Sequence, residues 1–208
     1  MRIIDADGHV AEGASLAAEA MQRWPQHIAA RADGRALVIE GRNYPEADGP
    51  GAGCPREHGL STAAGINYTS AEGVLGDADR DHIDTMVLYP SLGLCAPTLD
   101  DPEFAAGFAR LYNQWIADYC GPTRGRLRGI AVAPIEQVDV AVDVMREAKD
   151  LGLVATHIPP ALKTRNLDHP DLDPFYAAAV ELDMPLGIHG APGMHLPKVG
   201  VDRFTNYI

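Results

Sequence analysis

Short apolar runs and helical patterns alternate along most of the chain. Five runs rich in aliphatic residues, bounded by polar residues, glycine or proline, are typical of short buried strands. They are Ile3–Ala6, Thr85–Tyr89, Leu127–Ala133, Val154–Ile158 and Leu186–His189. Because these runs are apolar on both sides, they favour a parallel sheet that is covered by helices over an antiparallel sheet with one solvated face.

Segments with a helical period lie between the later strands. The clearest begins at Asp101-Pro102, which supplies an acidic first turn and a proline where a helix tolerates it. Its apolar residues recur every three or four positions as far as Tyr119, and Gly121-Pro122 ends it. The other predicted helices are Asp77–His82, Val138–Leu151 and Leu172–Leu182. The alternation predicts an α/β fold, and both a doubly wound sheet and an incomplete barrel fit it.

Residues 10–72 interrupt this alternation. They contain a candidate helix, Ser15–Arg31, a candidate hairpin, Ala36–Tyr44, and a glycine- and proline-rich stretch at 49–55. Connections of this length inside a domain are uncommon unless they are functional or disordered. We therefore predict a single domain over residues 1–208, with an insertion of about residues 10–72 after the first strand. We expect this insertion to cover one end of the domain.

Composition argues against several classes of partner. The 17 Lys+Arg against 29 Asp+Glu give a formal charge of −12, which disfavours nucleic acid and anionic membranes because both attract basic patches. No apolar run approaches the roughly 20 residues of a membrane span, and the first residues lack the apolar core of a signal peptide. The three cysteines form no CxxC pair, so we expect a reducing cytoplasm rather than a disulfide framework.

Residues that can bind a metal follow two of the predicted strands. Asp7 and His9 come after the first strand, and His189 ends the fifth. Ligands of parallel α/β folds gather at the carboxyl edge of the sheet, where the strands end. Alternate residues of a strand point to the same face. One carboxylate and two imidazoles there suit a divalent metal. Each segment alone has a plainer interpretation, a turn for Asp7 and His9 and a structural histidine for His189, and their coincidence is what favours a metal.

His157 ends the fourth predicted strand. Because Ile158-Pro159-Pro160 follows it, His157 fits a pocket wall or a helix cap as readily as a metal ligand or an acid/base, and we take it as the candidate catalytic residue. A nucleotide-binding domain is a further hypothesis that the sequence disfavours, since no glycine-rich GxGxxG loop follows the first strand.

Five segments carry a family resemblance through their order and spacing. They are Ile4–Glu12, Asp79–Pro90, Tyr112–Trp115, Arg128–Pro134 and Pro185–His189. Together they resemble the amidohydrolase-related family that includes aminocarboxymuconate-semialdehyde decarboxylase and the resorcylate decarboxylases. The resemblance extends over nearly the whole chain apart from the insertion.

This resemblance implies a (β/α)₈ TIM barrel of the metal-dependent hydrolase type with one divalent metal ion, usually zinc and sometimes manganese. The family's first-strand metal pair falls on Asp7 and His9, and its fifth-strand metal histidine falls on His189. Asp5 and Glu12 are then supporting or structural groups. Members of the family are often dimers, so the resemblance also implies a homodimer.

The family's sixth-strand histidine and eighth-strand aspartate have no counterpart before Ile208. A complete eight-unit barrel typically needs about 250 residues, and the insertion takes up part of this chain. We therefore expect a barrel that is truncated after about five strands, and its open edges should make the chain poorly stable unless a partner covers them.

These features predict a metal-dependent hydrolase or decarboxylase that acts on a small carboxylated substrate, aromatic or enolic. Arg56 and His58 of the insertion are candidates to meet the substrate carboxylate. The alternative is a catalytically inactive fragment that lacks the last metal ligand. Whether the purified chain holds a metal ion separates the two hypotheses.

Overall fold

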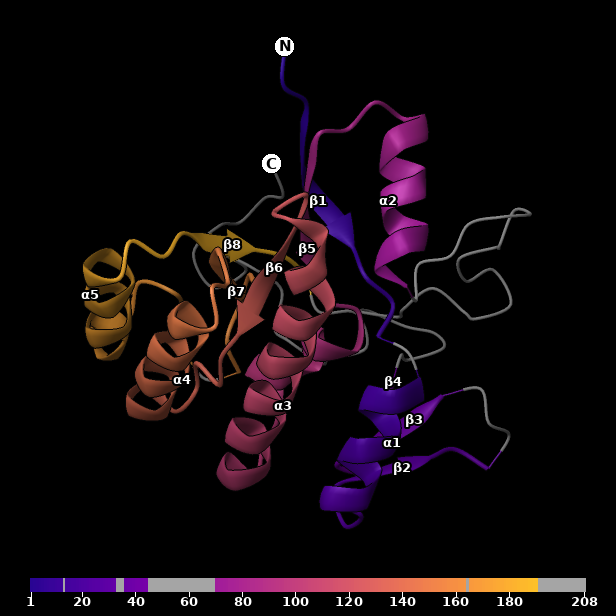
Figure 1. Ribbon diagram of the computed structural model, residues 1–208. Helices are drawn as coiled ribbons and strands as arrows, with labels where there is room; N and C mark the ends of the chain where they lie inside the picture. Colours follow the sequence, from indigo (N-terminus) through magenta and orange to yellow (C-terminus); the bar gives the residue numbers. More distant parts are fainter. Residues whose placement is uncertain (13, 33–35, 45–69, 164, 191–208) are drawn as a thin grey trace, which may run out of the picture.

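Five parallel strands form the main sheet of the computed structural model, which describes residues 1–12, 14–32, 36–44, 70–163 and 165–190 (Figure 1). The strands are β1 (Ile4–His9), β5 (Thr85–Tyr89), β6 (Leu127–Val132), β7 (Ala155–Ile158) and β8 (Leu186–Ile188). They lie in the order β1-β5-β6-β7-β8, and every neighbouring pair is parallel. The five predicted strands are confirmed, with bounds that differ by at most three residues.

Strand order separates the two folds that the hydrophobic pattern leaves open. The strands of the main sheet lie side by side in the order of the chain, without a reversal. A doubly wound sheet reverses its strand order at a switch point, whereas a barrel of β/α units does not. The main sheet therefore has the topology of successive strands of a TIM barrel, as the resemblance implies.

Helices connect these strands and lie outside the sheet (Figure 1). The helix bounds are α2 (Ala71–Arg80), α3 (Pro102–Cys120), α4 (Val138–Asp150) and α5 (Asp173–Glu181), with short 3₁₀ helices η1 (Leu92–Thr98), η2 (Gly121–Thr123) and η3 (Pro170–Leu172). α3 begins where the sequence predicts, because the Asp101 carboxylate accepts a hydrogen bond from the Phe104 N–H at 2.8 Å. α3 contacts β6 and α4, and α4 contacts α5.

One face of α3 forms the centre of the core. Phe104, Phe108, Tyr112 and Ile116 recur every four residues, and none of them is more than 1% exposed. Residues four apart lie on the same face of a helix, so α3 turns a continuous apolar stripe inward. Full burial of such a side chain contributes roughly 1.5–3 kcal/mol, which makes this stripe the main support of the sheet from outside.

The described part of the insertion folds as a helix and a small sheet. These elements are α1 (Ala14–Arg23) and the antiparallel strands β2 (Ile28–Ala30), β3 (Leu37–Ile39) and β4 (Arg42–Tyr44). The predicted hairpin is confirmed, and its turn places Glu40 and Gly41 at φ of 49° and 77°. The predicted helix Ser15–Arg31 is wrong in its second half, because Pro25 prevents the helix from continuing.

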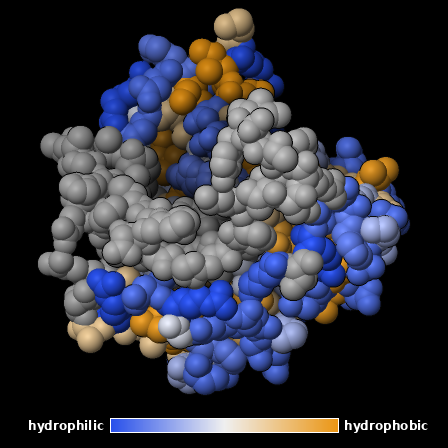
Figure 2. All heavy atoms as spheres, turned by 180° about the vertical axis from the view of Figure 1, so that it is seen from behind, coloured by the Kyte–Doolittle hydropathy of each residue, from blue (hydrophilic) through white to orange (hydrophobic). Residues whose placement is uncertain are grey.

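The outer strands of the main sheet carry exposed apolar side chains. Ile4 on β1 is 60% exposed and Ile188 on β8 is 63% exposed. Among the described strands, β1 pairs only with β5, and β8 pairs only with β7. Seen from behind, hydrophobic surface lies at the top of the molecule, the end at which the chain begins (Figure 2). Within the described residues, both edges of the sheet thus remain unpaired.

Two further features of the described residues concern membrane spans and thiol chemistry. No described helix is long and apolar enough to cross a membrane. Cys95 and Cys120 are buried free thiols, and burial raises the pKa of both thiol groups, which keeps them protonated and unreactive.

Asn113 joins α3 to the end of β6 through a paired contact inside the core. Its side-chain amide donates to the Val132 carbonyl at 3.0 Å, and its side-chain oxygen accepts from the Val132 N–H at 2.9 Å. Asn113 is 2% exposed, so no bulk water replaces these bonds. The pair satisfies both main-chain groups of a strand residue that leads into the carboxyl edge of the sheet.

We expect Asn113→Leu to lower the free energy of unfolding by about 2–4 kcal/mol, because it leaves the N–H and the carbonyl of Val132 buried without partners. Urea unfolding measures this loss. The neighbouring exposed variant Gln114→Ala serves as the control and should change stability by less than about 0.5 kcal/mol. A loss below about 1 kcal/mol for Asn113→Leu would contradict the proposed importance of the pair.

Candidate metal centre

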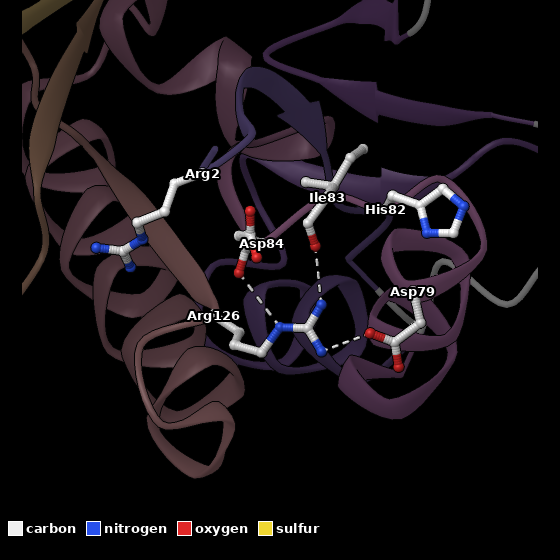
Figure 3. Close-up of a pocket in the computed structure, with 6 residues that line it drawn as sticks. All are labelled: Arg2, Asp79, His82, Ile83, Asp84 and Arg126. Atoms are coloured by element: carbon white, nitrogen blue, oxygen red, sulfur yellow. Dashed lines mark hydrogen bonds and ion pairs between the residues drawn. The ribbon is translucent and has the colours of Figure 1, made fainter.

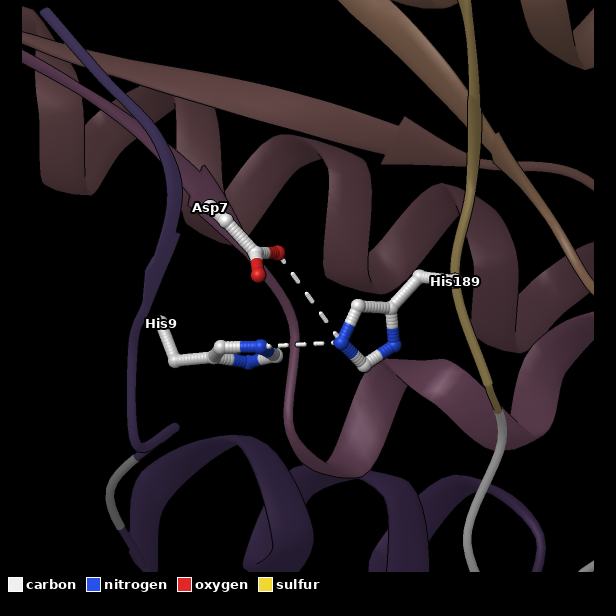
Figure 4. A group of neighbouring side chains, drawn as sticks. All are labelled: Asp7, His9 and His189. Atoms are coloured by element: carbon white, nitrogen blue, oxygen red, sulfur yellow. Dashed lines mark hydrogen bonds and ion pairs between the residues drawn. The ribbon is translucent and has the colours of Figure 1, made fainter.

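Asp7, His9 and His189 meet at the carboxyl edge of the main sheet (Figure 4). Asp7 and His9 belong to β1, and His189 follows the last residue of β8. The Nε2 atoms of the two histidines are 3.1 Å apart, and Asp7 Oδ1 is 4.0 Å from His189 Nε2. One ligand atom from each residue lies within 4.8 Å of the others. The structure thus brings together the three residues that the sequence predicts as ligands.

Main-chain carbonyl groups determine which nitrogen of each histidine carries the proton. His9 Nδ1 lies 3.1 Å from the Pro90 oxygen, and His189 Nδ1 lies 2.6 Å from the Gly190 oxygen. A carbonyl oxygen only accepts hydrogen bonds, so both Nδ1 atoms are the protonated donors. In the neutral rings, both Nε2 atoms then present lone pairs to each other.

This arrangement fits a shared cation. Two lone pairs facing each other at 3.1 Å repel unless a proton or a metal ion lies between or beside them. Burial and the neighbouring His189 lower the pKa of His9, which disfavours a proton between the two Nε2 atoms. Ligands about 2.0–2.2 Å from a tetrahedral zinc ion are roughly 3.3–3.6 Å from each other, and the distances of His189 Nε2 from its two neighbours, 3.1 and 4.0 Å, bracket that range. Imidazole and carboxylate together suit Zn²⁺ and Mn²⁺.

Tyr89 at the end of β5 completes the wall of the cluster, and sequence analysis did not single it out. Its ring centre lies 5.1 Å from that of His189 and 6.0 Å from that of His9. A side chain at Gly187 would place its Cβ 2.2 Å from the Tyr89 hydroxyl, so glycine is required there for the ring to fit. Burial and the Asp7 carboxylate raise the pKa of Tyr89, which keeps the hydroxyl a hydrogen-bond donor. The position of Tyr89 at the end of a predicted strand is the feature of the sequence that could have identified it.

His157 lies behind the cluster rather than in it. Its side chain is fully buried, and its Nε2 donates to the His189 carbonyl at 3.0 Å. Burial lowers the pKa of His157 to about 4, so the ring is neutral at pH 7. Its Nδ1 has no hydrogen-bond partner among the described residues. The described contact supports the main chain of His189, and a role as acid/base stays a prediction.

The two acidic residues predicted to be structural have main-chain partners. Asp5 Oδ1 accepts a hydrogen bond from the Asp7 N–H at 3.0 Å. Glu12 accepts from main-chain N–H groups of the loop that follows β5. Arg56 and His58, predicted to contact substrate, lie outside the described residues.

A hollow of about 520 Å³ lies at the opposite edge of the sheet from the cluster (Figure 3). Its most connected side chain is Arg126, which donates to Asp79 at 2.6 Å and to the Ile83 carbonyl at 2.9 Å. These bonds tie the start of β6 to the turn before β5. The charge of Arg126 is thus matched within the fold, and the hollow has the properties of a structural junction.

Comparison with known proteins agrees with the fold. The sequence model of the family described as amidohydrolase matches residues 4–203. The γ-resorcylate decarboxylase of Rhodococcus jostii is 28% identical over an alignment of 124 positions, and the match covers 53% of this chain and 36% of that protein.

Two solved structures share the fold at low identity. The 5-carboxyvanillate decarboxylase of Novosphingobium aromaticivorans, with bound manganese and a substituted nitrobenzoic acid, gives a TM-score of 0.62 at 22% identity over 91% of this chain and 51% of that one. An amidohydrolase of Mycobacterium avium subsp. paratuberculosis gives 0.69 at 18% identity over 92% and 58%. The chain spans about half the length of the solved relatives it matches.

The buried neutral state of His157 predicts a pH dependence of stability. Its pKa of about 4 in the folded chain lies below the ordinary 6.5, so the unfolded chain takes up the proton first as pH falls. The stabilisation is complete above pH 6.5 and is lost between pH 6.5 and 4. Between pH 7 and 5 the metal-free wild type should lose about 2 kcal/mol more than His157→Gln, which keeps an N–H donor but does not titrate. Urea unfolding at both pH values measures the difference, and equal losses would contradict the lowered pKa.

Proposed function

The chain belongs to the amidohydrolase family, and from that premise we propose that the protein is a metal-dependent decarboxylase of small aromatic carboxylates. The observation that carries the proposal is the cluster of Asp7, His9 and His189, in which the Nε2 atoms of the two imidazoles lie 3.1 Å apart. The choice of decarboxylation rests on the R. jostii relative, a γ-resorcylate decarboxylase.

In this proposal Asp7, His9 and His189 hold one divalent cation, Zn²⁺ or Mn²⁺. When bound, the cation supplies a positive charge that orients and polarises the oxygens of a carboxylated substrate. The carbonyls of Pro90 and Gly190 keep both histidine Nε2 atoms available as ligands. Such partners behind metal ligands typically fix ring orientation and raise ligand basicity.

Two further side chains have proposed roles beside the cation. The Tyr89 hydroxyl, kept protonated beside Asp7, would donate a hydrogen bond to a substrate oxygen. His157 would act as the acid/base only through Nδ1, because its Nε2 is bound to the His189 carbonyl. Loss of a carboxyl group as CO₂ leaves a carbanion-like carbon that must receive a proton. His157 would deliver one only after its Nδ1 has taken up a proton, because the neutral ring carries its proton on Nε2.

Hydrolysis of a small carbonyl substrate is the second candidate, favoured by the family description itself. The same three ligands would then serve to lower the pKa of a bound water. A third hypothesis, a chain without catalysis, predicts that the metal site is not functional. We further propose a cytoplasmic homodimer, which rests on the buried free thiols of the described residues and on the family resemblance.

Metal binding tests the cluster directly. After treatment with a chelator, the purified chain should bind one Mn²⁺ or Zn²⁺ ion per molecule in a calorimetric titration. His189→Ala should weaken binding by about 100-fold or more, because it removes one of three protein ligands. His82→Asn is the matched control, since it removes a histidine outside the cluster and asparagine tolerates the φ of 58° at that position. A wild-type chain that binds no metal would favour the inactive fragment.

Catalysis is tested by CO₂ release from 2,6-dihydroxybenzoate and 5-carboxyvanillate in the presence of Mn²⁺ or Zn²⁺. We expect activity with at least one of these probes and its loss in Asp7→Asn, which keeps the shape of the side chain but removes its charge. Cleavage of ester or lactone probes by the metal-loaded chain, with no CO₂ release, would instead establish the hydrolase.

A further inference from the structure

The loop Pro90–Gly93, which follows β5 and includes the first two residues of η1, lies between the candidate metal centre and the insertion. Four groups from outside the loop bind it. His9 Nδ1 donates to the Pro90 carbonyl at 3.1 Å, and the Tyr44 hydroxyl donates to the Ser91 carbonyl at 2.6 Å. The Ser91 hydroxyl donates to the Val10 carbonyl at 2.9 Å. The fourth group is the carboxylate of Glu12.

Glu12 binds three consecutive main-chain N–H groups of this loop. Its Oε1 accepts from Ser91 at 3.0 Å and from Gly93 at 2.9 Å, and its Oε2 accepts from Leu92 at 2.8 Å. Burial raises the pKa of Glu12, and these N–H donors oppose that effect because they favour the ionised form. A carboxylate that accepts three N–H bonds determines the orientation of three successive peptide groups.

The geometry of the loop leaves little room for another arrangement. A Cβ at Gly93 would lie 2.8 Å from Pro90 Cβ and 2.8 Å from Tyr112 Cδ2. The turn is thus packed against the buried face of α3 on one side and bound by Glu12 on the other. The Pro90 carbonyl, which precedes the first bound N–H, is held in the direction of His9.

We propose that Glu12 is a positioning residue of the metal centre. By holding the N–H groups of Ser91, Leu92 and Gly93, it orients the Pro90 carbonyl, which keeps the proton of His9 on Nδ1 and leaves Nε2 free to bind the cation. Glu12 contacts neither the cation nor the substrate. The part of this inference that concerns metal affinity rests on the proposed function, whereas the part that concerns the protonated nitrogen of His9 does not.

The plainer role for Glu12 is to stabilise the start of η1 without any effect on His9. Asp101 provides the matched control for that role, because its carboxylate caps the N-terminus of α3 by accepting from Phe104 at 2.8 Å. Among the described residues, Asp101 makes no hydrogen bond to the loop Pro90–Gly93 or to His9. Asp101→Ala should therefore lower stability, by the amount typical of a lost cap, and leave His9 unchanged.

Two substitutions of Glu12 remove different numbers of its hydrogen bonds to the loop. In Glu12→Gln, Oε1 can still accept from Ser91 and Gly93, but the amide N–H₂ faces the Leu92 N–H, so one of three bonds is replaced by a donor facing a donor. Glu12→Ala removes all three bonds. We expect Mn²⁺ affinity to fall about 10-fold in Glu12→Gln and about 100-fold in Glu12→Ala, the range typical of groups that orient metal ligands.

The experiment measures two properties of the wild type, Glu12→Gln, Glu12→Ala and Asp101→Ala. Imidazole nitrogen NMR of the metal-free chain identifies the protonated nitrogen of His9, and calorimetry gives the Mn²⁺ affinity. We expect Nδ1–H in the wild type and in Asp101→Ala, and a mixture of both tautomers in the Glu12 variants. Glu12→Gln carries the test if Glu12→Ala does not fold.

One outcome would overturn the inference: a folded Glu12 variant that is destabilised like Asp101→Ala but keeps the wild-type tautomer of His9 and the wild-type Mn²⁺ affinity. Glu12 would then act only as a cap of η1. A wild type that binds no Mn²⁺ would count against the proposed function alone. In that case, a tautomer shift in the Glu12 variants still supports the positioning role, and its absence overturns it.

Discussion

The contact between His9 and His189 depends on the curl of the main sheet, and the candidate metal centre depends on that contact. The two histidines lie at the ends of the first and last of five strands. Across a flat sheet with strands about 4.8 Å apart, these strands would be roughly 19 Å from each other. Their Nε2 atoms are 3.1 Å apart, so the sheet curls far enough for side chains from its two outer strands to meet across the interior.

Packing from both sides maintains this curl. Outside the sheet, the apolar stripe of α3 and the paired bonds of Asn113 hold β6. Inside, Tyr89 fills the space between β5 and β8 because Gly187 has no side chain to displace its ring. The cluster therefore lies on rigid elements, which suits a site that must hold three ligand atoms within a few tenths of an ångström of their working positions.

The candidate centre combines one exposed acid with two imidazoles whose Nε2 atoms face each other. Each ring is fixed by a carbonyl oxygen, from Pro90 for His9 and from Gly190 for His189. Main-chain groups thus decide the tautomers, and side chains farther away, Glu12 and His157, hold those main-chain segments. The orientation of the two rings therefore depends on residues outside the three candidate ligands.

The pattern of apolar residues determined the strands, most helices and the edge at which chemistry gathers, because each depends on local periodicity. The Asp7, His9 and His189 set was also predictable, since residues at the ends of parallel strands share one edge. Local pattern failed where a single proline ended α1 near Arg23, so that Ile28–Ala30 pairs as a strand. Only the tertiary structure decided between barrel and doubly wound order, the place of His157 behind the cluster, and the bonds of Glu12 to a loop about 80 residues away. Those features depend on contacts between distant segments, and periodicity carries no information about which distant segments meet.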